Sequence, residues 1–281
     1  MKKSTKNLSL WSALLLILLQ PPESAKAETM TLIQTQEVQG GYERSLFKHW
    51  VDEDGDGCDT RKEVLISEAL TAPIIGARCS LSGGKWISIY DGVAVTNASS
   101  LDIDHVVPLA EAWRSGAWAW TSYQRTQFAN DTAESRALIA VTASSNRSKG
   151  DSDLKSWLPA YNRCDYIEAW VSIKLRYALT FDSGEVSVIK GFLSDCKNLK
   201  ISTKVLSGYS VTLDSARPDY KEVALEFGTD TKNATSTSVT SQKIIRLYGS
   251  CTIEGSKGHA DSGATYICKR TATDPKLKWR R

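Results

Sequence analysis

Residues 101–108 read Leu-Asp-Ile-Asp-His-Val-Val-Pro, and residues 138–151 read Leu-Ile-Ala-Val-Thr-Ala-Ser-Ser-Asn-Arg-Ser-Lys-Gly-Asp. The first stretch is apolar and β-branched with charged residues at alternate positions, which predicts a strand over residues 101–107. The apolar run over residues 137–142 predicts a second strand, and Asn146 is expected at the start of a helix that follows it. The sequence thus predicts an Asp-His pair at the end of one strand and an amide at a helix start.

These side chains suit a hydrolase that uses a divalent cation. Neighbouring side chains of a strand point to opposite faces, so Asp104 and His105 can address different targets. The Asp104 carboxylate can bind a hard cation and Asn146 can supply a second oxygen, since Mg²⁺ commonly takes only one or two protein ligands. The His105 imidazole can hold a water molecule and accept its proton near neutral pH. An Asp-His pair alone is a weak signal, and the flanking motifs strengthen it.

The order of the motifs resembles a known family. Asp-His-Val-Val-Pro-Leu-Ala-Glu-Ala-Trp over residues 104–113, a Trp-rich helical insert and Asn-Arg-Ser-Lys-Gly-Asp over residues 146–151 are similar to the HNH, or ββα-metal, nucleases. Within these, the chain looks most like secreted bacterial HNH proteins related to the C-terminal domain of GmrSD-type restriction enzymes. The resemblance covers residues 44–200 and implies an α+β fold with a ββα-metal core. It also implies that His105 is the general base and that Asp104 and Asn146 hold Mg²⁺ or Mn²⁺.

Five further residues are candidates for supporting roles. Arg147 and Lys149 follow the amide and could contact backbone phosphates, although either could equally be a surface charge at a helix start. Arg61 lies in the resembling segment and is a candidate phosphate-binding or active-site arginine. Glu111 could orient His105 or a metal-bound water molecule. Asp102 shares a strand face with Asp104 and could be a further ligand or a structural cap.

The sequence departs from the family pattern in two ways. The Asn that braces the loop between the two strands should fall near Ala137, which cannot do so; Ser135 or a backbone carbonyl would have to replace it. The chain also has only three histidines, at positions 49, 105 and 259. A site with several His ligands around Zn²⁺ is therefore not expected.

The first 27 residues predict a signal peptide. A basic start is followed by a mostly apolar run over residues 8–19, which is too short to span a bilayer comfortably, and by Ala25-Lys26-Ala27. Cleavage there would remove four lysines and one glutamate, so the net charge of +3 would fall to zero. We expect a secreted, monomeric protein with no membrane span after cleavage. Nucleic acid would then bind through a local basic patch with little sequence preference.

Six cysteines predict three disulfides in an exported chain. Fifteen pairings are possible. Pairing between neighbours in the sequence is the simplest of them: Cys58–Cys79, Cys164–Cys196 and Cys251–Cys268.

Residues 52–63 satisfy the spacing of a calcium-binding loop, Asp-x-Asp-x-Asp-Gly-x5-Glu. The carboxylates of Asp52, Asp54 and Asp56 could converge on one Ca²⁺ ion, and Glu63 could bind it through both oxygens. Cys58 lies inside this stretch and no clear helix precedes it. A turn-rich loop without an ion is the competing interpretation.

The rest of the chain completes an α+β prediction. Residues 44–200 hold most of the tryptophans and are expected to form the core. Residues 28–45 look like a polar lead-in. Residues 164–179 show helical spacing of apolar residues, whereas residues 201–281 are Ser- and Thr-rich and read as a small β-rich region of unknown role. A hairpin is expected there between residues 244–253 and 264–269.

The favoured function is that of a secreted endonuclease which hydrolyses phosphodiester bonds of DNA or RNA. The rival from another class is a non-catalytic calcium-binding or cell-surface binding module built on the loop over residues 52–63. Metal-dependent cleavage of nucleic acid would separate the two.

Overall fold

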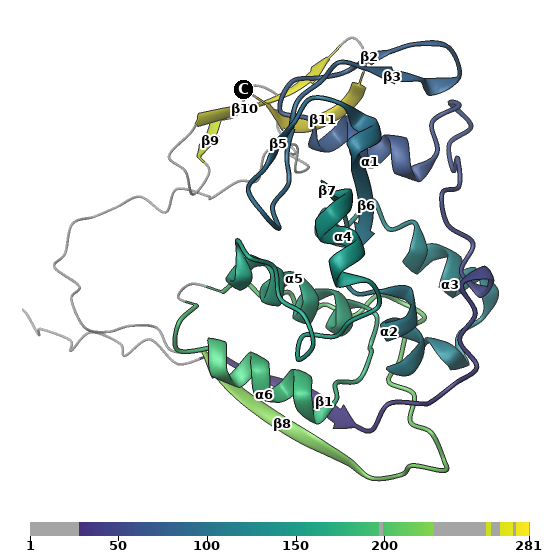
Figure 1. The fold of residues 1–281 in the computed structure, drawn as a ribbon. Coiled ribbons are helices and arrows are strands. Elements are labelled where there is room, and N and C mark those ends of the chain that lie inside the picture. Colours follow the sequence, from purple (N-terminus) through teal and green to yellow (C-terminus); the bar gives the residue numbers. More distant parts are fainter. Residues whose placement is uncertain (1–27, 197–198, 228–256, 260–264, 272–273, 281) are drawn as a thin grey trace, which may run out of the picture.

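A computed structural model describes residues 28–196, 199–227, 257–259, 265–271 and 274–280 (Figure 1). The model is a mixed α/β structure with five small antiparallel sheets among these residues. No helix in the described part of the chain combines the length and apolar character needed to cross a membrane.

A ββα unit lies at the centre of the fold. Strand β6 (Leu101–His105) pairs antiparallel with β7 (Leu138–Thr142), and helix α4 (Ala143–Lys149) follows β7 directly. The Thr142 side chain caps α4 by accepting the amide of Ser145, and Gly150 ends the helix with φ 53°. Both predicted strands and the predicted helix are therefore present. Helix α1 (Thr60–Glu68) contacts the same pair of strands.

The connection between β6 and β7 is the predicted helical insert. It consists of α2 (Leu109–Arg114), a short 3-10 helix (Ala117–Ala119) and α3 (Ser122–Ala129). The capping box at Thr121 and Gln124 starts α3. Where the family pattern would place its bracing Asn, the carbonyl of Ala137 accepts the amide of Val106 at 3.1 Å. This bond extends the β6–β7 pairing by one residue, and the replacement of the bracing Asn stays a prediction.

Two further helices contribute to the main core. Helix α5 (Arg163–Arg176) confirms the helix expected over residues 164–179, but residues 166–174 are buried on all sides of the helix rather than along one face. Helix α6 (Ser183–Phe192) begins with a capping box at Asp182 and Glu185. Trp170, Ile167 and Val171 of α5 are completely buried against residues of the insert, β7 and α6. Trp120 of the insert is 6 % exposed and belongs to the same core.

Two short hairpins precede β6. One joins β2 (Ile74–Ile75) to β3 (Leu81–Ser82), and the other joins β4 (Trp86–Ile87) to β5 (Ala94–Val95). Short apolar runs on either side of Asp91-Gly92 predict a hairpin turn at this pair, and the turn closes the second hairpin. This turn brings Tyr90 and Asp91 to the ββα unit.

The prediction of a polar lead-in over residues 28–45 is wrong. Residues Glu28–Thr35 form β1, which pairs over its full length with β8 (Tyr220–Phe227); Figure 1 shows the two strands side by side next to α6. Met30 and Leu32 of β1 and Leu225 of β8 belong to the main core. The alternating apolar residues of β1 can be buried as one face of a sheet only because β1 pairs with β8. The paired residues are 185 or more positions apart in the sequence, so a local sequence pattern does not reveal the pairing.

The end of the chain contains β9 (Lys257–His259), β10 (Thr265–Thr271) and β11 (Asp274–Arg280), which form one antiparallel sheet. The hairpin expected between residues 244–253 and 264–269 falls partly outside the described residues, as does Cys251 with its predicted bond to Cys268. The disulfides Cys58–Cys79 and Cys164–Cys196 are confirmed.

Candidate functional site

Asp104, at the end of β6, is buried and fully bonded. The Lys149 ammonium of α4 lies 2.9 Å from each of its carboxylate oxygens, and the Tyr90 hydroxyl donates to Oδ2 at 2.5 Å. The side chain of Asp104 is 7 % exposed and that of Lys149 is 0 % exposed. Burial raises the pKa of the Asp104 carboxyl, and the Lys149 ammonium opposes part of that rise.

His105 is held in one orientation by its neighbours. Its Nε2 lies 2.9 Å from the carbonyl oxygen of Ala129, and its ring stacks on Trp50 with 5.4 Å between centroids. A carbonyl oxygen only accepts, so Nε2 carries the proton and Nδ1 keeps a lone pair. Burial lowers the pKa of His105 to about 3, although the bond to Ala129 opposes this. The imidazole is therefore neutral at physiological pH.

Asn146 lies on α4 one turn before Lys149, and it contacts Asp102 rather than Asp104. Its Nδ2 donates to Asp102 Oδ2 at 3.1 Å. The prediction paired Asn146 with Asp104; the structure instead forms two parallel contacts from α4 to β6, Asn146 to Asp102 and Lys149 to Asp104. The four residues are called the site cluster below. Asp102 also raises the pKa of Asp104, which places the two carboxylates near each other.

The site cluster opens to solvent at Asp102, whose side chain is 30 % exposed. The Arg147 guanidinium, 78 % exposed, lies 3.9 Å from Asp102 Oδ2. Arg147 is thus an exposed charge, which fits either of its two predicted roles, whereas Lys149 is buried in an ion pair and is not a surface charge. Arg61 donates from Nη2 to the carbonyl of Leu101 at 2.7 Å, so this guanidinium braces β6.

Two residues of this region were not found by sequence reasoning. Tyr90 reaches Asp104, and the Asp91 carboxylate accepts hydroxyls of Thr142 and of Ser145, the latter at 2.8 Å. The Tyr-Asp-Gly turn was recognised only as a turn. Its contact with the start of α4 depends on how the β4–β5 hairpin folds over the ββα unit, and no local pattern encodes that.

Glu111 belongs to a different cluster from the one predicted for it. Its carboxylate contacts Lys174 at 2.7 Å and Arg114 at 2.7 Å, and Lys174 also lies 2.6 Å from Glu185. No described contact joins Glu111 to His105. Glu37 of the chain after β1 completes this group through Arg114 at 3.1 Å. We call these five residues the acid cluster.

The acid cluster carries three carboxylates and two cations. Burial and the neighbouring carboxylate of Glu111 raise the pKa of Glu37 to about 8. Burial also raises the pKa of Glu185 to about 7. Lys174 works against burial and holds the pKa of Glu111 below its ordinary value. One proton held by the group near neutral pH balances its excess negative charge.

The acidic loop before α1 gathers carboxylates at the surface. Oxygens of Asp52, Asp54 and Asp56 lie within 4.8 Å of one another, and all three residues are exposed. Asp52 accepts the amides of Gly55 and Gly57 at 2.9 and 3.0 Å. These bonds shape the loop and also occupy carboxylate oxygens.

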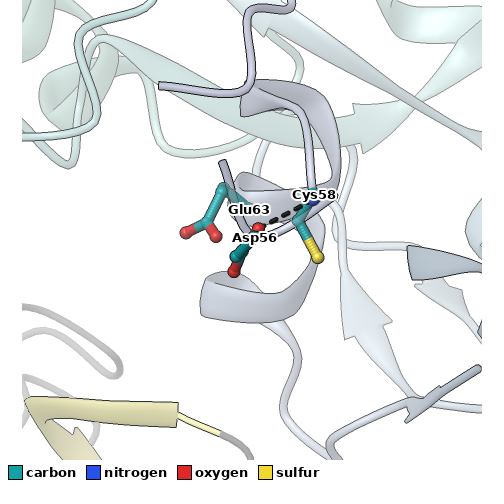
Figure 2. Close-up of side chains that lie close together, drawn as sticks. All are labelled: Asp56, Cys58 and Glu63. Carbon is teal, nitrogen blue, oxygen red and sulfur yellow. Dashed lines mark hydrogen bonds between the residues drawn. The ribbon is translucent and has the colours of Figure 1, made fainter. Parts of the chain in front are cut away.

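Glu63 approaches the other end of this loop. Oxygens of Asp56 and Glu63 lie within 4.8 Å of the Cys58 sulfur, and Figure 2 shows the amide of Cys58 bonded to Asp56. Cys58 is in a disulfide with Cys79, so it supplies no thiolate. Any cation here would bind carboxylate and carbonyl oxygens, which are calcium-type ligands.

Comparison with known proteins places this geometry in a family context. Residues 79–183 match the family model of the GmrSD restriction endonucleases, C-terminal domain. This segment contains β6, β7 and α4. No solved structure matches the chain.

A fungal relative is similar over a longer stretch. It is an uncharacterized secreted protein of Arthroderma benhamiae (strain ATCC MYA-4681 / CBS 112371), 39 % identical over 180 residues, which cover 62 % of this chain and 87 % of the relative. The name of this relative supports the prediction of secretion, and we conclude that the present chain is secreted. The chain belongs to one protein family with this fungal protein, and its segment 79–183 is related to the C-terminal domain of GmrSD restriction endonucleases.

Proposed function

We propose that the protein is a secreted endonuclease of the HNH, or ββα-metal, type that hydrolyses phosphodiester bonds of DNA or RNA. The observation that carries the proposal is the β6–β7–α4 unit, with His105 at the end of β6 and Asn146 on α4, inside the segment that matches a restriction endonuclease domain. A family relationship alone leaves the activity open, so the proposal also depends on the chemistry of these side chains.

His105 is the proposed general base. Its Nε2 proton is held by the Ala129 carbonyl, so Nδ1 is the atom that can take a proton from water. With a pKa lowered to about 3, the ring is unprotonated at neutral pH but is a weak base by itself. A phosphodiester anion beside the ring would stabilise the imidazolium and raise its pKa as the proton transfers.

The side chains around the site cluster fit a divalent cation in kind. Carboxylate and amide oxygens of Asp102, Asp104 and Asn146 are the ligands that Mg²⁺ and Mn²⁺ prefer. Asp102 is the accessible carboxylate, because both oxygens of Asp104 are bonded to Lys149. The ion would supply positive charge for the phosphate oxygens and the leaving oxygen during hydrolysis.

Binding of nucleic acid would be local rather than driven by the whole protein. The predicted mature chain has a net charge of zero, so long-range attraction to a polyanion is weak. The exposed Arg147 next to Asp102 is the candidate phosphate contact at the site. Such contacts give little sequence preference and strong salt dependence.

The test is cleavage of plasmid DNA and of a structured RNA by the purified secreted protein, with Mg²⁺, Mn²⁺ or EDTA. We expect cleavage with the metals only, and a loss of about 10²- to 10⁴-fold in His105→Ala, the usual contribution of a general base. His49→Gln is the matched control, because it removes the neighbouring imidazole, whose ring centre lies 6.5 Å from that of His105. Equal cleavage by His105→Ala and the natural protein would refute the assignment.

A calcium-binding module remains the second candidate, favoured by the convergence of Asp52, Asp54 and Asp56. If this loop binds Ca²⁺ with an extracellular-type Kd of about 10⁻⁴–10⁻³ M, 1 mM Ca²⁺ stabilises the fold by roughly 0.4–1.4 kcal/mol. A thermal-shift titration of the natural protein and of Asp54→Asn measures this. Absence of nuclease activity together with a Ca²⁺ shift abolished in Asp54→Asn would favour the module over the nuclease.

A further inference from the structure

Lys149 occupies the position where a cation would bind Asp104. Its ammonium donates to Asp104 Oδ1 and to the carbonyl oxygen of His105, each at 2.9 Å, and lies 2.9 Å from Asp104 Oδ2 in the same ion pair. The side chain is completely buried. A cation surrounded by three oxygens at the end of β6 is therefore already part of the fold.

Among the residues that the structure describes, no other positive charge contacts Asp104. Tyr90 donates a neutral hydrogen bond to it, His105 is neutral at physiological pH, and Asp102 adds a second negative charge nearby. An uncompensated carboxylate at this depth would be strongly destabilised. Lys149 is thus the charge that opposes the effect of burial on the Asp104 carboxylate.

This arrangement cannot coexist with a divalent ion on Asp104. An ion bound to either Asp104 oxygen would lie within a few ångströms of the ammonium, and like charges that close repel strongly in a buried site. The ion must either stay at the exposed end with Asp102 and Asn146, or displace Lys149. A displaced lysine has a flexible four-carbon stem and three donors, which suit it to bind a phosphate oxygen.

We infer that Lys149 is the built-in counter-cation of Asp104 in the metal-free protein and competes with a divalent cation for that carboxylate. The inference rests on the proposed function, since it assigns a second state to the same site. In the metal-free state the ion pair joins α4 to β6. With a divalent ion on Asp104, the ion would replace the ammonium on that carboxylate, and the freed ammonium could contact a substrate phosphate.

The test is Mn²⁺ binding by isothermal titration calorimetry to the natural protein and to Lys149→Met, which keeps the length of the side chain and removes the charge. We expect Lys149→Met to bind Mn²⁺ about tenfold more tightly or better, because a neighbouring charge typically changes such an equilibrium by one to three powers of ten. Its melting temperature should fall in EDTA and recover with Mn²⁺ by more than that of the natural protein. Lys190→Met, which removes an exposed lysine from the last turn of α6, should match the natural protein in both measurements.

Two further variants keep the outcome decisive. Asp104→Asn combined with Lys149→Met removes both charges and should restore the metal-free melting temperature while losing the gain in Mn²⁺ affinity. If Lys149→Met does not fold, Lys149→Gln replaces it. Unchanged or weaker Mn²⁺ binding by the folded single variant overturns the inference. Tighter Mn²⁺ binding in a protein that cleaves no nucleic acid would instead sustain the inference and remove the proposed nuclease function.

Discussion

The site cluster and the acid cluster both bury charged side chains, but they balance those charges differently. In the acid cluster, Glu111, Lys174 and Glu185 are completely buried, and the excess carboxylate is balanced by a proton. In the site cluster, the second carboxylate, Asp102, is 30 % exposed and is balanced by solvent and Arg147. The buried centre of the acid cluster holds helices together, whereas the exposed carboxylate of the site cluster can exchange its counter-ions with solutes.

The sequence does not distinguish the two clusters. Glu111 follows Asp104 by seven residues and appears to be part of the same motif. The turn of the chain at Pro108 and the helix α2 direct its side chain to α5 and α6 instead, where Lys174 and Glu185 lie. Proximity in sequence therefore does not place a residue in the site. The difference between the site cluster and the acid cluster is best tested with variants that disrupt each cluster separately.

The largest effect is expected from Lys174→Met. This change leaves Glu111 and Glu185 buried without their shared cation, and breaking a buried ion pair from one side costs about 3–5 kcal/mol. Urea unfolding at pH 7 measures the loss, with Lys190→Met as the exposed control. The folded fraction should retain its cleavage activity. A loss below about 1 kcal/mol would contradict the structural role of the acid cluster.

A smaller effect is expected from Asp104→Asn, which leaves the Lys149 ammonium buried beside a neutral amide. The loss should be about 3 kcal/mol, the lower end of the cost of breaking a buried ion pair from one side, because the ammonium keeps its bond to the His105 carbonyl. Asp102→Asn is the matched variant in the exposed half of the same cluster. It should change the free energy of unfolding by less than about 0.5 kcal/mol while still lowering cleavage. Equal destabilisation by the two variants would mean that the cluster is as closed as the acid cluster.

Much of the fold near the site could be predicted because its signals are local. The two strands, the helix after β7, the helical insert and α5 each have their own periodicity or caps. Cys58–Cys79 and Cys164–Cys196 also followed the simplest pairing. Residues 28–35 could not be assigned, since β1 is defined by a partner strand near the other end of the chain.

The candidate site was predictable as a set of residues but not as a set of contacts. Asp102, Asp104, Asn146 and Lys149 do meet, yet their pairing depends on the register of β6 against α4. A displacement of α4 by one turn along β6 would decide whether Asp104 faces Asn146 or Lys149. Tyr90 was missed because its approach to Asp104 comes from a hairpin whose sequence carries no chemical motif.

An effect smaller than that of Lys174→Met, and specific to the acid cluster, is expected from Glu37→Gln. The pKa of Glu37 is about 8 in the folded protein against an ordinary value of 4.5, so between these pH values the folded state binds more protons than the unfolded state. The stability of the natural protein therefore contains a contribution that is complete below pH 4.5 and declines as the pH rises toward 8. Glutamine resembles the protonated acid, and the variant should be more stable than the natural protein by about 1–2 kcal/mol at pH 8 and equal to it at pH 4. Urea unfolding at both pH values, with the exposed Glu222→Gln as control, measures this. If the difference in stability is the same at pH 4 and pH 8, the acid cluster holds no proton at neutral pH. Its excess negative charge would then be balanced by solvent and the partly exposed Arg114, as solvent and Arg147 balance Asp102 in the site cluster.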